Sequence, residues 1–217
     1  MDVIDRLDAV RVRWNVLRHP FYLSWSAGTL ERAELAFYAG QYRHAVVALA
    51  EASGRAAEAA DGRASAELSR HADEEGAHVS LWDDFIAALG AETDCAARPE
   101  TTSCAAAWTA GEDLLERLAV LYAVESAQPA VSQAKLDGLG RHYGMGADDP
   151  GSAYFAVHSE RDHQHAAQSR RLLRERAGEG DADRLVERAE AALRGNWRLL
   201  DGVDAHTRAG PPEPAAG

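Results

Sequence analysis

Helical periodicity runs along almost the whole chain and constrains its fold more than any other feature. Apolar residues recur about every 3.6 positions in long segments, and short runs rich in glycine, proline or aspartate separate these segments. The segments are rich in alanine, arginine and glutamate, which are good helix formers, and no convincing strand competes with them. We therefore expect an all-α protein with helices over residues 2–18, 29–59, 63–89, 103–109, 111–139, 151–177 and 181–203.

The length of the chain and the absence of linkers predict one domain. A chain of 217 residues can bury a sizeable core and does not require a second domain. We find no internal repeat, so we expect a single bundle of about seven helices over residues 1–205. Residues 206–217 end in "AGPPEPAAG". Because this segment is rich in proline and glycine, we expect a disordered C-terminal tail.

The charge balance limits the partners. The chain has 35 acidic and 23 basic residues and a net charge of −12, so we expect neither nucleic acid nor an anionic membrane as partner, because both are polyanions. Small molecules and proteins remain as possible partners, and we expect a small molecule. No apolar stretch reaches the roughly 18 residues that indicate a membrane span, and the charged, amphipathic N-terminus does not resemble a signal peptide. We expect a cytoplasmic protein in which Cys95 and Cys104 are ordinary thiols.

The segment "HSERDHQH", residues 158–165, has the spacing of a metal site. On an α-helix, His158, Asp162 and His165 lie at roughly 0°, 40° and −20°, within one narrow stripe. His163 falls off this stripe. Three groups that can bind a metal therefore share one helix face. A solvated helix surface that happens to be rich in histidine is the alternative interpretation.

A second predicted helix also carries polar groups on its apolar stripe. In "HADEEGAHVSLWDDF", His78 follows Glu75 by three residues and Glu74 by four. Glu-x-x-His is the pairing with which helical bundles build dimetal carboxylate sites. We prefer Glu75 as the ligand for its spacing and keep Glu74 as the alternative. An ordinary surface pair would have the same spacing.

Glu125 is the third polar group, and it lies in the apolar segment "LYAVESAQP". A buried carboxylate is costly without a partner, so we expect it to contact a metal or a cation such as arginine. Pro129 cannot donate a hydrogen bond to the Glu125 carbonyl, which predicts a kink at this point. The mixture of carboxylates and imidazoles suits a pair of redox-active first-row metals better than calcium or structural zinc. The candidate ligands are Glu75 or Glu74, His78, Glu125, His158, Asp162 and His165.

The chain has a single lysine, Lys135, whereas its other 22 basic residues are arginine. Lys135 lies ten residues after Glu125, in the same predicted helix. A buried lysine can lose its proton and act as an amine, which arginine cannot do. This difference gives a chemical reason for lysine at position 135, although chance would also leave one lysine.

Several motifs together resemble the haem-oxygenase-like di-iron oxidases over about residues 15–177. Within that family they resemble the branch of self-sacrificing 4-aminobenzoate synthases that contains the chlamydial protein associating with death domains. The spacing His-x3-Asp-x2-His is the most specific of these motifs. Thiaminase-like and pyrroloquinoline-quinone-synthase-like proteins share the scaffold but lack this ligand set. The motifs are "HPFYLSWSAGTL", "EE" followed by "HVSLWDDFIAALG", "LYAVESAQP" and "YFAVHSERDHQHA".

The resemblance implies a haem-oxygenase-like fold and two non-haem metal ions, Fe/Fe or Mn/Fe, with O2 and an external reductant as co-substrates. It further implies that Tyr22 is cut out of the chain and converted to 4-aminobenzoate, a folate precursor. Lys135 would act as amine donor or redox participant, and Tyr38 and Tyr42 match other tyrosines near the site. For each tyrosine, packing in the core is the alternative role.

The chain departs from the chlamydial relative at two places. Fewer residues separate the paired acids from His78, which leaves open whether Glu74 or Glu75 binds metal. Val124 stands where that relative has a tyrosine, so a radical route through the aromatic residues could differ.

Two other functions fit the same sequence. A dimetal oxygenase of this fold could act on an external amino acid, fatty acid or specialised metabolite, with Tyr22 and Lys135 lining its pocket. A non-enzymatic helical interaction protein is the third possibility, which metal analysis would separate from the other two. Scaffolds of this kind often dimerise, so we expect a homodimer.

Overall fold

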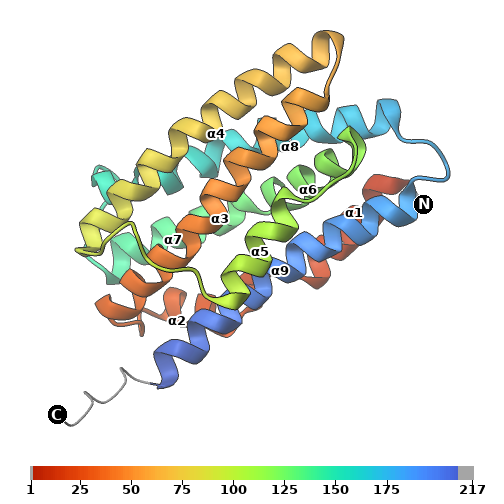
Figure 1. Ribbon diagram of the computed structural model, residues 1–217. Coiled ribbons are helices and arrows are strands. Elements are labelled where there is room, and N and C mark those ends of the chain that lie inside the picture. Colours follow the sequence, from red (N-terminus) through yellow and green to blue (C-terminus); the bar gives the residue numbers. More distant parts are fainter. Residues whose placement is uncertain (1, 210–217) are drawn as a thin grey trace.

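The computed structural model describes residues 2–209, which form nine α-helices, two short 3₁₀ helices and no strand (Figure 1). The all-α prediction is confirmed, with more helices than the seven expected. The α-helices are α1 (Val3–Arg13), α2 (Pro20–Ala27), α3 (Arg32–Ala59), α4 (Gly62–Leu89), α5 (Pro99–Thr109), α6 (Leu114–Glu125), α7 (Gln128–His142), α8 (Ala153–Arg176) and α9 (Ala182–Ala209). The 3₁₀ helices are η1 (Val16–Arg18) and η2 (Pro150–Ser152).

The longest helices run along one another and enclose the core. α3 and α4 are joined by only two residues and pack together as a hairpin, while α8 packs on α6 and α7 (Figure 1). The buried apolar side chains form two clusters. The larger contains Trp25, Trp82 and Trp108, and the smaller contains Leu68 and Leu172. α4 and α8 both pass from one apolar cluster to the other. The buried polar residues in the middle of these two helices therefore lie at the border of the two clusters.

The short helix α2 was missing from the sequence prediction. His19 caps its N-terminus, since its Nδ1 accepts a hydrogen bond of 3.1 Å from the Phe21 amide. Pro20 occupies the first turn, where a missing N–H has no cost. Gly28 ends the helix in the left-handed conformation at φ 69°. Eight residues are too few for a clear apolar period, but α2 carries Tyr22.

The helix predicted over residues 111–139 is interrupted at the expected place. α6 ends at Glu125 and α7 begins at Gln128, with Pro129 in its first turn. Because Pro129 has no N–H, the Glu125 carbonyl receives no intrahelical bond from it, and the chain breaks here rather than only kinking. The break leaves Glu125 at the C-terminus of a helix, beside the polar residues of α4.

The last helix extends past the start of the predicted tail. α9 continues to Ala209, so the prediction of a disordered tail is wrong for residues 206–209. These residues contain no helix breaker, and the His206 ring stacks on Phe37 of α3 at a centroid distance of 3.9 Å. The remaining predicted tail residues, 210–217, lie outside the described residues.

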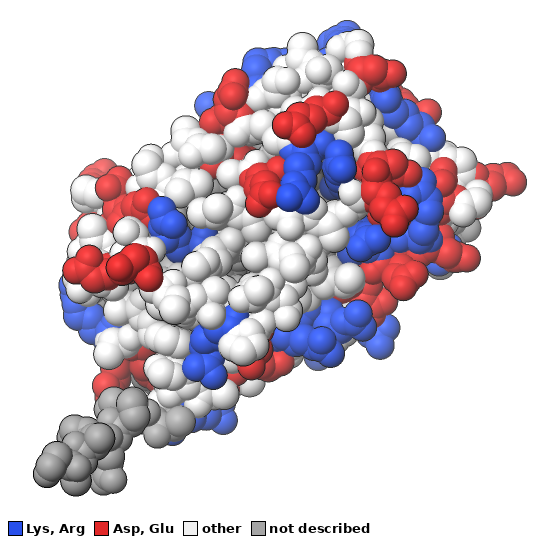
Figure 2. Space-filling view, viewed as in Figure 1, with Lys and Arg blue, Asp and Glu red and all other residues white. Residues whose placement is uncertain are grey.

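The surface charges, the apolar character of the helices and the two cysteines can be compared with the expectations from the composition. Acidic and basic side chains are interspersed over the face shown in Figure 2. Within residues 2–209, no helix combines the length and the apolar character that crossing a membrane requires. Cys95 and Cys104 are both free thiols, as predicted.

Candidate metal centre

Seven polar side chains from three helices meet between the two apolar clusters. All of them are buried, with exposed fractions of 8% or less. On α4 the three contributing residues lie at i, i+4 and i+7, so they share one helix face. We call this group the metal cluster because it is a candidate site for metal, and it consists of His71, Glu75 and His78 of α4, Glu125 of α6, and His158, Asp162 and His165 of α8.

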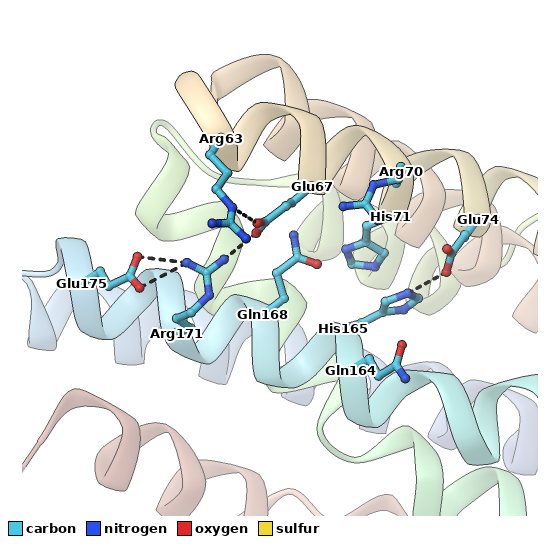
Figure 3. A pocket seen from close by; sticks show the side chains of 10 residues that line it. All are labelled: Arg63, Glu67, Arg70, His71, Glu74, Gln164, His165, Gln168, Arg171 and Glu175. Atoms are coloured by element: carbon cyan, nitrogen blue, oxygen red, sulfur yellow. Dashed lines mark hydrogen bonds and ion pairs between the residues drawn. The ribbon is translucent and has the colours of Figure 1, made fainter.

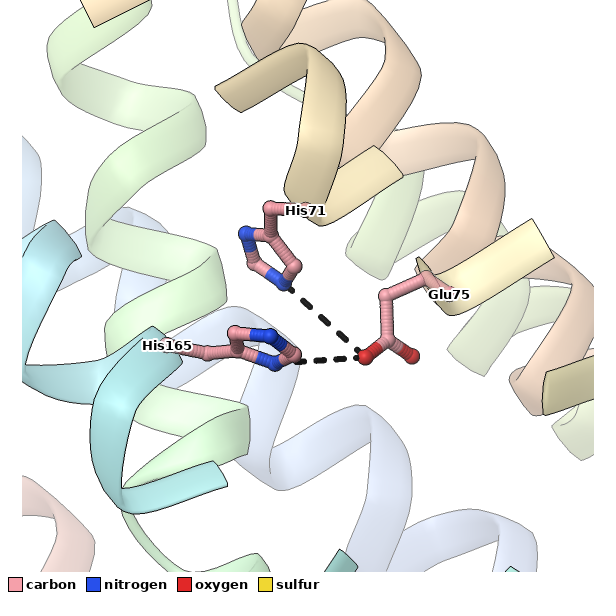
Figure 4. A group of neighbouring side chains, drawn as sticks. All are labelled: His71, Glu75 and His165. Atoms are coloured by element: carbon pink, nitrogen blue, oxygen red, sulfur yellow. Dashed lines mark ion pairs between the residues drawn. The ribbon is translucent and has the colours of Figure 1, made fainter. Parts of the chain in front are cut away.

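Glu75 lies at the centre of this group. Its Oε1 is 3.4 Å from His165 Nδ1 and 3.9 Å from His71 Nε2 (Figure 4), and 3.3 Å from His78 Nδ1. Two sets of possible ligands share it: His71, Glu75 and His165, and Glu75, His78 and His158, with the ligand atoms of each set within 4.8 Å of one another. A carboxylate common to two such sets suits a ligand that bridges two metal ions.

The donor atoms of the cluster fit a metal pair. Among the described residues, none makes a hydrogen bond to His71 Nε2, Glu75 Oε1, His78 Nδ1, His158 Nε2, His165 Nδ1 or either carboxylate oxygen of Glu125. Glu125 Oε1 lies 2.8 Å from His71 Nε2, but the geometry of this ion pair is not that of a hydrogen bond. Each unsatisfied buried polar group costs about 1–3 kcal/mol. Metal coordination would satisfy all of them at once.

His71 was missed by the sequence analysis. Its ring stacks on His165 at a centroid distance of 3.9 Å and an interplanar angle of 28°. It is also the partner of Glu125, which forms no ion pair with an arginine among the described residues, so the alternative of an arginine partner does not hold. The signal was available, because His71 precedes Glu75 by four residues and lies on the same stripe of the helix.

The structure separates the two adjacent acids. Glu75 is buried and faces the other ligands, whereas the Glu74 side chain is 43% exposed. Glu74 Oε2 lies 3.0 Å from His165 Nε2, on the far side of that ring from Glu75. The preference for Glu75 as the inward-facing acid agrees with this geometry.

Asp162 lies at the site but belongs to neither set of three ligands. Both of its carboxylate oxygens are 2.9 Å from His158 Nδ1, and Oδ1 is 3.7 Å from His165 Nδ1. His158 therefore presents Nε2 to the cluster. His163 is exposed, as its position off the stripe predicts.

Charges of both signs are balanced in the cluster. Burial lowers the pKa of His165, but the Asp162 and Glu75 carboxylates offset this effect and raise the pKa to about 11. Burial raises the pKa of Glu75, yet the adjacent His165 and His78 rings bring it well below its ordinary range. Burial also raises the pKa of Glu125. Glu75 is therefore an anionic carboxylate, as a metal ligand must be.

Lys135 lies in a chamber of aromatic side chains. Its side-chain nitrogen, Nζ, is within 4.7–5.4 Å of the centroids of five rings. Nζ donates a 2.6 Å hydrogen bond to Tyr38 Oη, which lies 3.3 Å from Tyr22 Oη. Burial lowers the pKa of Lys135 well below its ordinary value and raises those of Tyr22 and Tyr38. We call this set the aromatic chamber: Lys135 with Tyr22, Tyr38, Tyr42, Trp82 and Phe155.

A glycine allows α2 and α7 to approach closely enough to form the chamber. A Cβ at Gly138 of α7 would lie only 2.5 Å from Trp25 Nε1. Trp25 Nε1 in turn donates a 3.3 Å hydrogen bond to the Lys135 carbonyl. Tyr22, three residues before Trp25 on α2, thus lies against Lys135.

Tyr154 connects the chamber to the metal cluster and was not identified from the sequence. Its ring lies 4.1 Å from the His158 ring and 4.8 Å from the Trp82 ring, both between centroids. Lys135 Nζ lies 5.4 Å from the Trp82 ring. Continuous ring contacts therefore lead from the metal cluster to Lys135, Tyr38 and Tyr22.

On another side the cluster borders an open pocket of about 490 Å³ (Figure 3). The metal-cluster residues His71 and His165 form part of its wall, and Glu74 reaches His165 there. Arg171 pairs with both Glu67 and Glu175. We call this the polar pocket, and its wall consists of Arg63, Glu67, Arg70, His71, Glu74, Gln164, His165, Gln168, Arg171 and Glu175.

Comparison with known proteins places the chain among redox enzymes. Residues 36–197 match the model of a family described as iron-containing redox enzymes. The 4-aminobenzoate synthase of Chlamydia muridarum (strain MoPn / Nigg) is 30% identical over 213 residues, covering 93% of this chain and 89% of the relative. The 4-aminobenzoate synthase of Nitrosomonas europaea is 33% identical over 227 residues, covering 92% and 89%.

Solved structures show the same fold. A domain of unknown function with a heme oxygenase-like fold from Shewanella denitrificans superposes with a TM-score of 0.81 at 20% identity, covering 100% of this chain and 99% of that one. The TenA homologue from P. horikoshii gives 0.75 at 18% identity, with coverage of 97% and 100%. The predicted haem-oxygenase-like fold is confirmed.

Proposed function

Since this chain belongs to the family of iron-containing redox enzymes, we propose that it is an O2-activating dimetal oxidase that makes 4-aminobenzoate from its own Tyr22. The observation that carries the proposal is the position of the chain's only lysine, buried against Tyr38 and next to Tyr22. The relatives named 4-aminobenzoate synthase, which align over more than nine tenths of the chain, support it.

The chemistry defines what the site must do. Tyrosine and 4-aminobenzoate share a benzene ring with two substituents in para positions. The conversion breaks the Cα–Cβ bond, oxidises Cβ to a carboxylate carbon and replaces the phenolic oxygen with nitrogen. The first two changes need an oxidant, for which O2 is available, and the third needs an amine. When bound, a metal pair would activate O2 and accept electrons from the substrate.

The residues of the cluster would hold the metal pair. The ligands would be Glu75, which both sets share, His71 and His165 of the first set with Glu125 beside His71, and His78 and His158 of the second set. Asp162 was predicted as a ligand and stays a candidate, because it lies beside both α8 histidines.

The aromatic chamber would hold the reacting groups away from water. Tyr22 is 2% exposed and Lys135 1%. Because burial lowers the pKa of Lys135, its nitrogen is available as a neutral amine. Tyr38 Oη lies between Lys135 Nζ and Tyr22 Oη and would orient both groups by hydrogen bonds.

Isotope labelling tests where the product comes from. Protein grown on ring-¹³C tyrosine is purified, loaded with Fe(II), or with Mn(II) and Fe(II), without oxygen, and then given unlabelled tyrosine, reductant and O2. We expect ¹³C-labelled 4-aminobenzoate in at most one equivalent per chain. Unlabelled product would mean that the substrate is free tyrosine, and no product would reject the proposed reaction.

A second label tests the role of Lys135. Because the chain has only one lysine, ¹⁵N-lysine labels one side-chain nitrogen at a single known position. Product that carries ¹⁵N identifies Lys135 as the amine donor. Product without ¹⁵N leaves Lys135 the role of redox participant.

One observation favours an alternative function. His71 and His165 form part of the wall of the polar pocket, so an external small molecule could approach the metal cluster from that side. An oxygenase that acts on such a molecule would leave Tyr22 intact through many turnovers. Quantifying the unmodified Tyr22 peptide after O2 exposure separates the two functions.

A further inference from the structure

His165 lies between two carboxylates of the same helix. Its Nε2 is 3.0 Å from Glu74 Oε2, and its Nδ1 is 3.4 Å from Glu75 Oε1. Glu75 is buried at the centre of the metal cluster, whereas Glu74 approaches from the polar pocket (Figure 3). Stacking on His71 at 3.9 Å fixes the plane of the His165 ring. The two ring nitrogens therefore face different environments.

The contact with Glu74 determines which nitrogen can bind metal. An ionised carboxylate only accepts hydrogen bonds, so Nε2 must carry the proton in this pair. An imidazole that binds a metal is neutral: it has one N–H, and its other nitrogen carries the lone pair that binds the metal. In His165 this nitrogen is Nδ1, which faces Glu75 and makes no hydrogen bond to the described residues.

We propose that Glu74 is a positioning residue that holds His165 in the Nε2–H form, so that Nδ1 binds the metal. Metal-ligating histidines usually donate their second N–H to such a partner, which fixes ring and tautomer. His158 is held in the opposite sense, because Asp162 contacts its Nδ1 and leaves Nε2 inward. The adjacent acids thus have different roles, Glu75 inside the cluster and Glu74 outside.

The place of Glu74 in the polar pocket provides a specific test. Its side chain is 43% exposed and the pocket is open, so Glu74→Ala should fold normally and leave space beside His165 Nε2. A formate ion from solution could occupy this space and accept the same hydrogen bond. Glu74→Gln keeps an acceptor oxygen at nearly the same place.

The experiment measures Mn(II) binding to the full chain by electron paramagnetic resonance of the free ion. We expect Glu74→Ala to weaken the affinity of one site by about 10- to 100-fold. Glu74→Gln should bind Mn(II) more tightly than Glu74→Ala by on the order of tenfold. Formate added to Glu74→Ala at about tens of millimolar should raise its affinity by a similar factor. The matched control is Glu67→Ala, which removes an acid of the same pocket that pairs with Arg63 and Arg171 but forms no hydrogen bond or ion pair with a histidine of the described residues.

The outcomes are distinct. Wild-type affinity in Glu74→Ala, or a loss that neither Gln nor formate restores, would overturn the assignment. An equal loss in Glu67→Ala would also overturn it, because general pocket charge would then explain the effect. The inference depends on the proposed function only in that metal binds here. Since the measurement uses neither O2 nor Tyr22, failure of 4-aminobenzoate formation would leave its result unchanged.

Discussion

The metal cluster has two very different neighbours, the aromatic chamber and the polar pocket. The chamber surrounds a buried lysine with five rings and places three hydroxyl and amine groups within hydrogen-bond reach. The pocket is open and lined by arginines, acids and amides. Both regions contact cluster histidines, the chamber through Tyr154 and His158 and the pocket through His165.

The difference between the two regions suggests that each has a separate role in the reaction. In the closed region, burial lowers the pKa of Lys135 and raises those of the tyrosines, which favours their neutral forms and suits chemistry on the chain itself. In the open region, Glu74 contacts the outer nitrogen of His165, and the pocket leaves this side of the cluster accessible from solvent. Changes in the chamber should therefore alter product formation, and changes near the pocket should alter metal binding.

The largest expected effect comes from removing the phenol of Tyr22. Tyr22→Phe loses the oxygen that nitrogen replaces, so we expect 4-aminobenzoate to fall to background while metal content stays at the wild-type level. Liquid chromatography with mass spectrometry measures the product. Tyr122→Phe is the control, because Tyr122 Oη bonds Asp8 at 2.9 Å in the other apolar cluster. Full product from Tyr22→Phe would remove Tyr22 as the source.

Removing a ligand near the pocket should change metal content instead. His71→Ala deletes one of the histidines that face Glu75 and leaves Glu125 without its partner. We expect the metal content to fall from about two ions per chain towards one. Elemental analysis measures it, with the exposed His163→Ala on α8 as control. Two ions bound as tightly as in the wild type would show that His71 is not a ligand.

A smaller effect should follow from closing the space between α2 and α7. Gly138→Ala would push Trp25 away and destabilise the fold by about 1–3 kcal/mol. It should also reduce product, because Tyr22 moves with Trp25. Gly140→Ala on the same helix is the control, since its Cβ would meet only the Met145 carbonyl at 3.8 Å. Urea denaturation measures the stability of both variants. Equal stability of the two would refute the close-approach argument.

The smallest effect concerns the buried lysine and pH. Because burial lowers the pKa of Lys135, the unfolded chain binds a proton that the folded chain does not, up to the unfolded value of about 10.4. Between the lowered pKa of Lys135 in the folded chain and the unfolded value, the stability of the wild type should therefore rise with pH. Lys135→Met lacks this contribution. We expect Lys135→Met to melt a few degrees higher at pH 7, about 2–4 °C per kcal/mol. The difference should shrink towards pH 10.

One result would contradict the predicted pH dependence. If the melting temperatures of Lys135→Met and wild type differ by the same amount from pH 7 to pH 10, Lys135 does not titrate in this interval. Lys135 would then be charged in the folded protein, and the argument for a neutral amine would fail.

The helical period made much of the cluster predictable from sequence. It placed His158, Asp162 and His165 on one face and separated His163 from them, and the structure agrees. Pro129 predicted the interruption beside Glu125. His71 lies on the same helix face one turn before Glu75, but the Glu-x-x-His pattern includes only residues that follow Glu75.

Other features depend on packing between distant segments and have no local signal. The outward direction of Glu74 requires α8 to lie beside α4, and the chamber requires Gly138 to admit Trp25. α2 is held by a histidine cap and by contacts with α7 rather than by its own periodicity. Tertiary contacts thus decide details that helical propensity leaves open.

The central claim is that the chain consumes its own Tyr22, and peptide mass spectrometry tests it most directly. Full-length protein is loaded with Fe(II), or with Mn(II) and Fe(II), without oxygen, then exposed to reductant and O2 and digested. We predict that the peptide containing Tyr22 loses the tyrosine side chain in proportion to the 4-aminobenzoate released. An intact Tyr22 peptide together with released 4-aminobenzoate would contradict the claim, and so would an intact peptide with no product from metal-loaded protein.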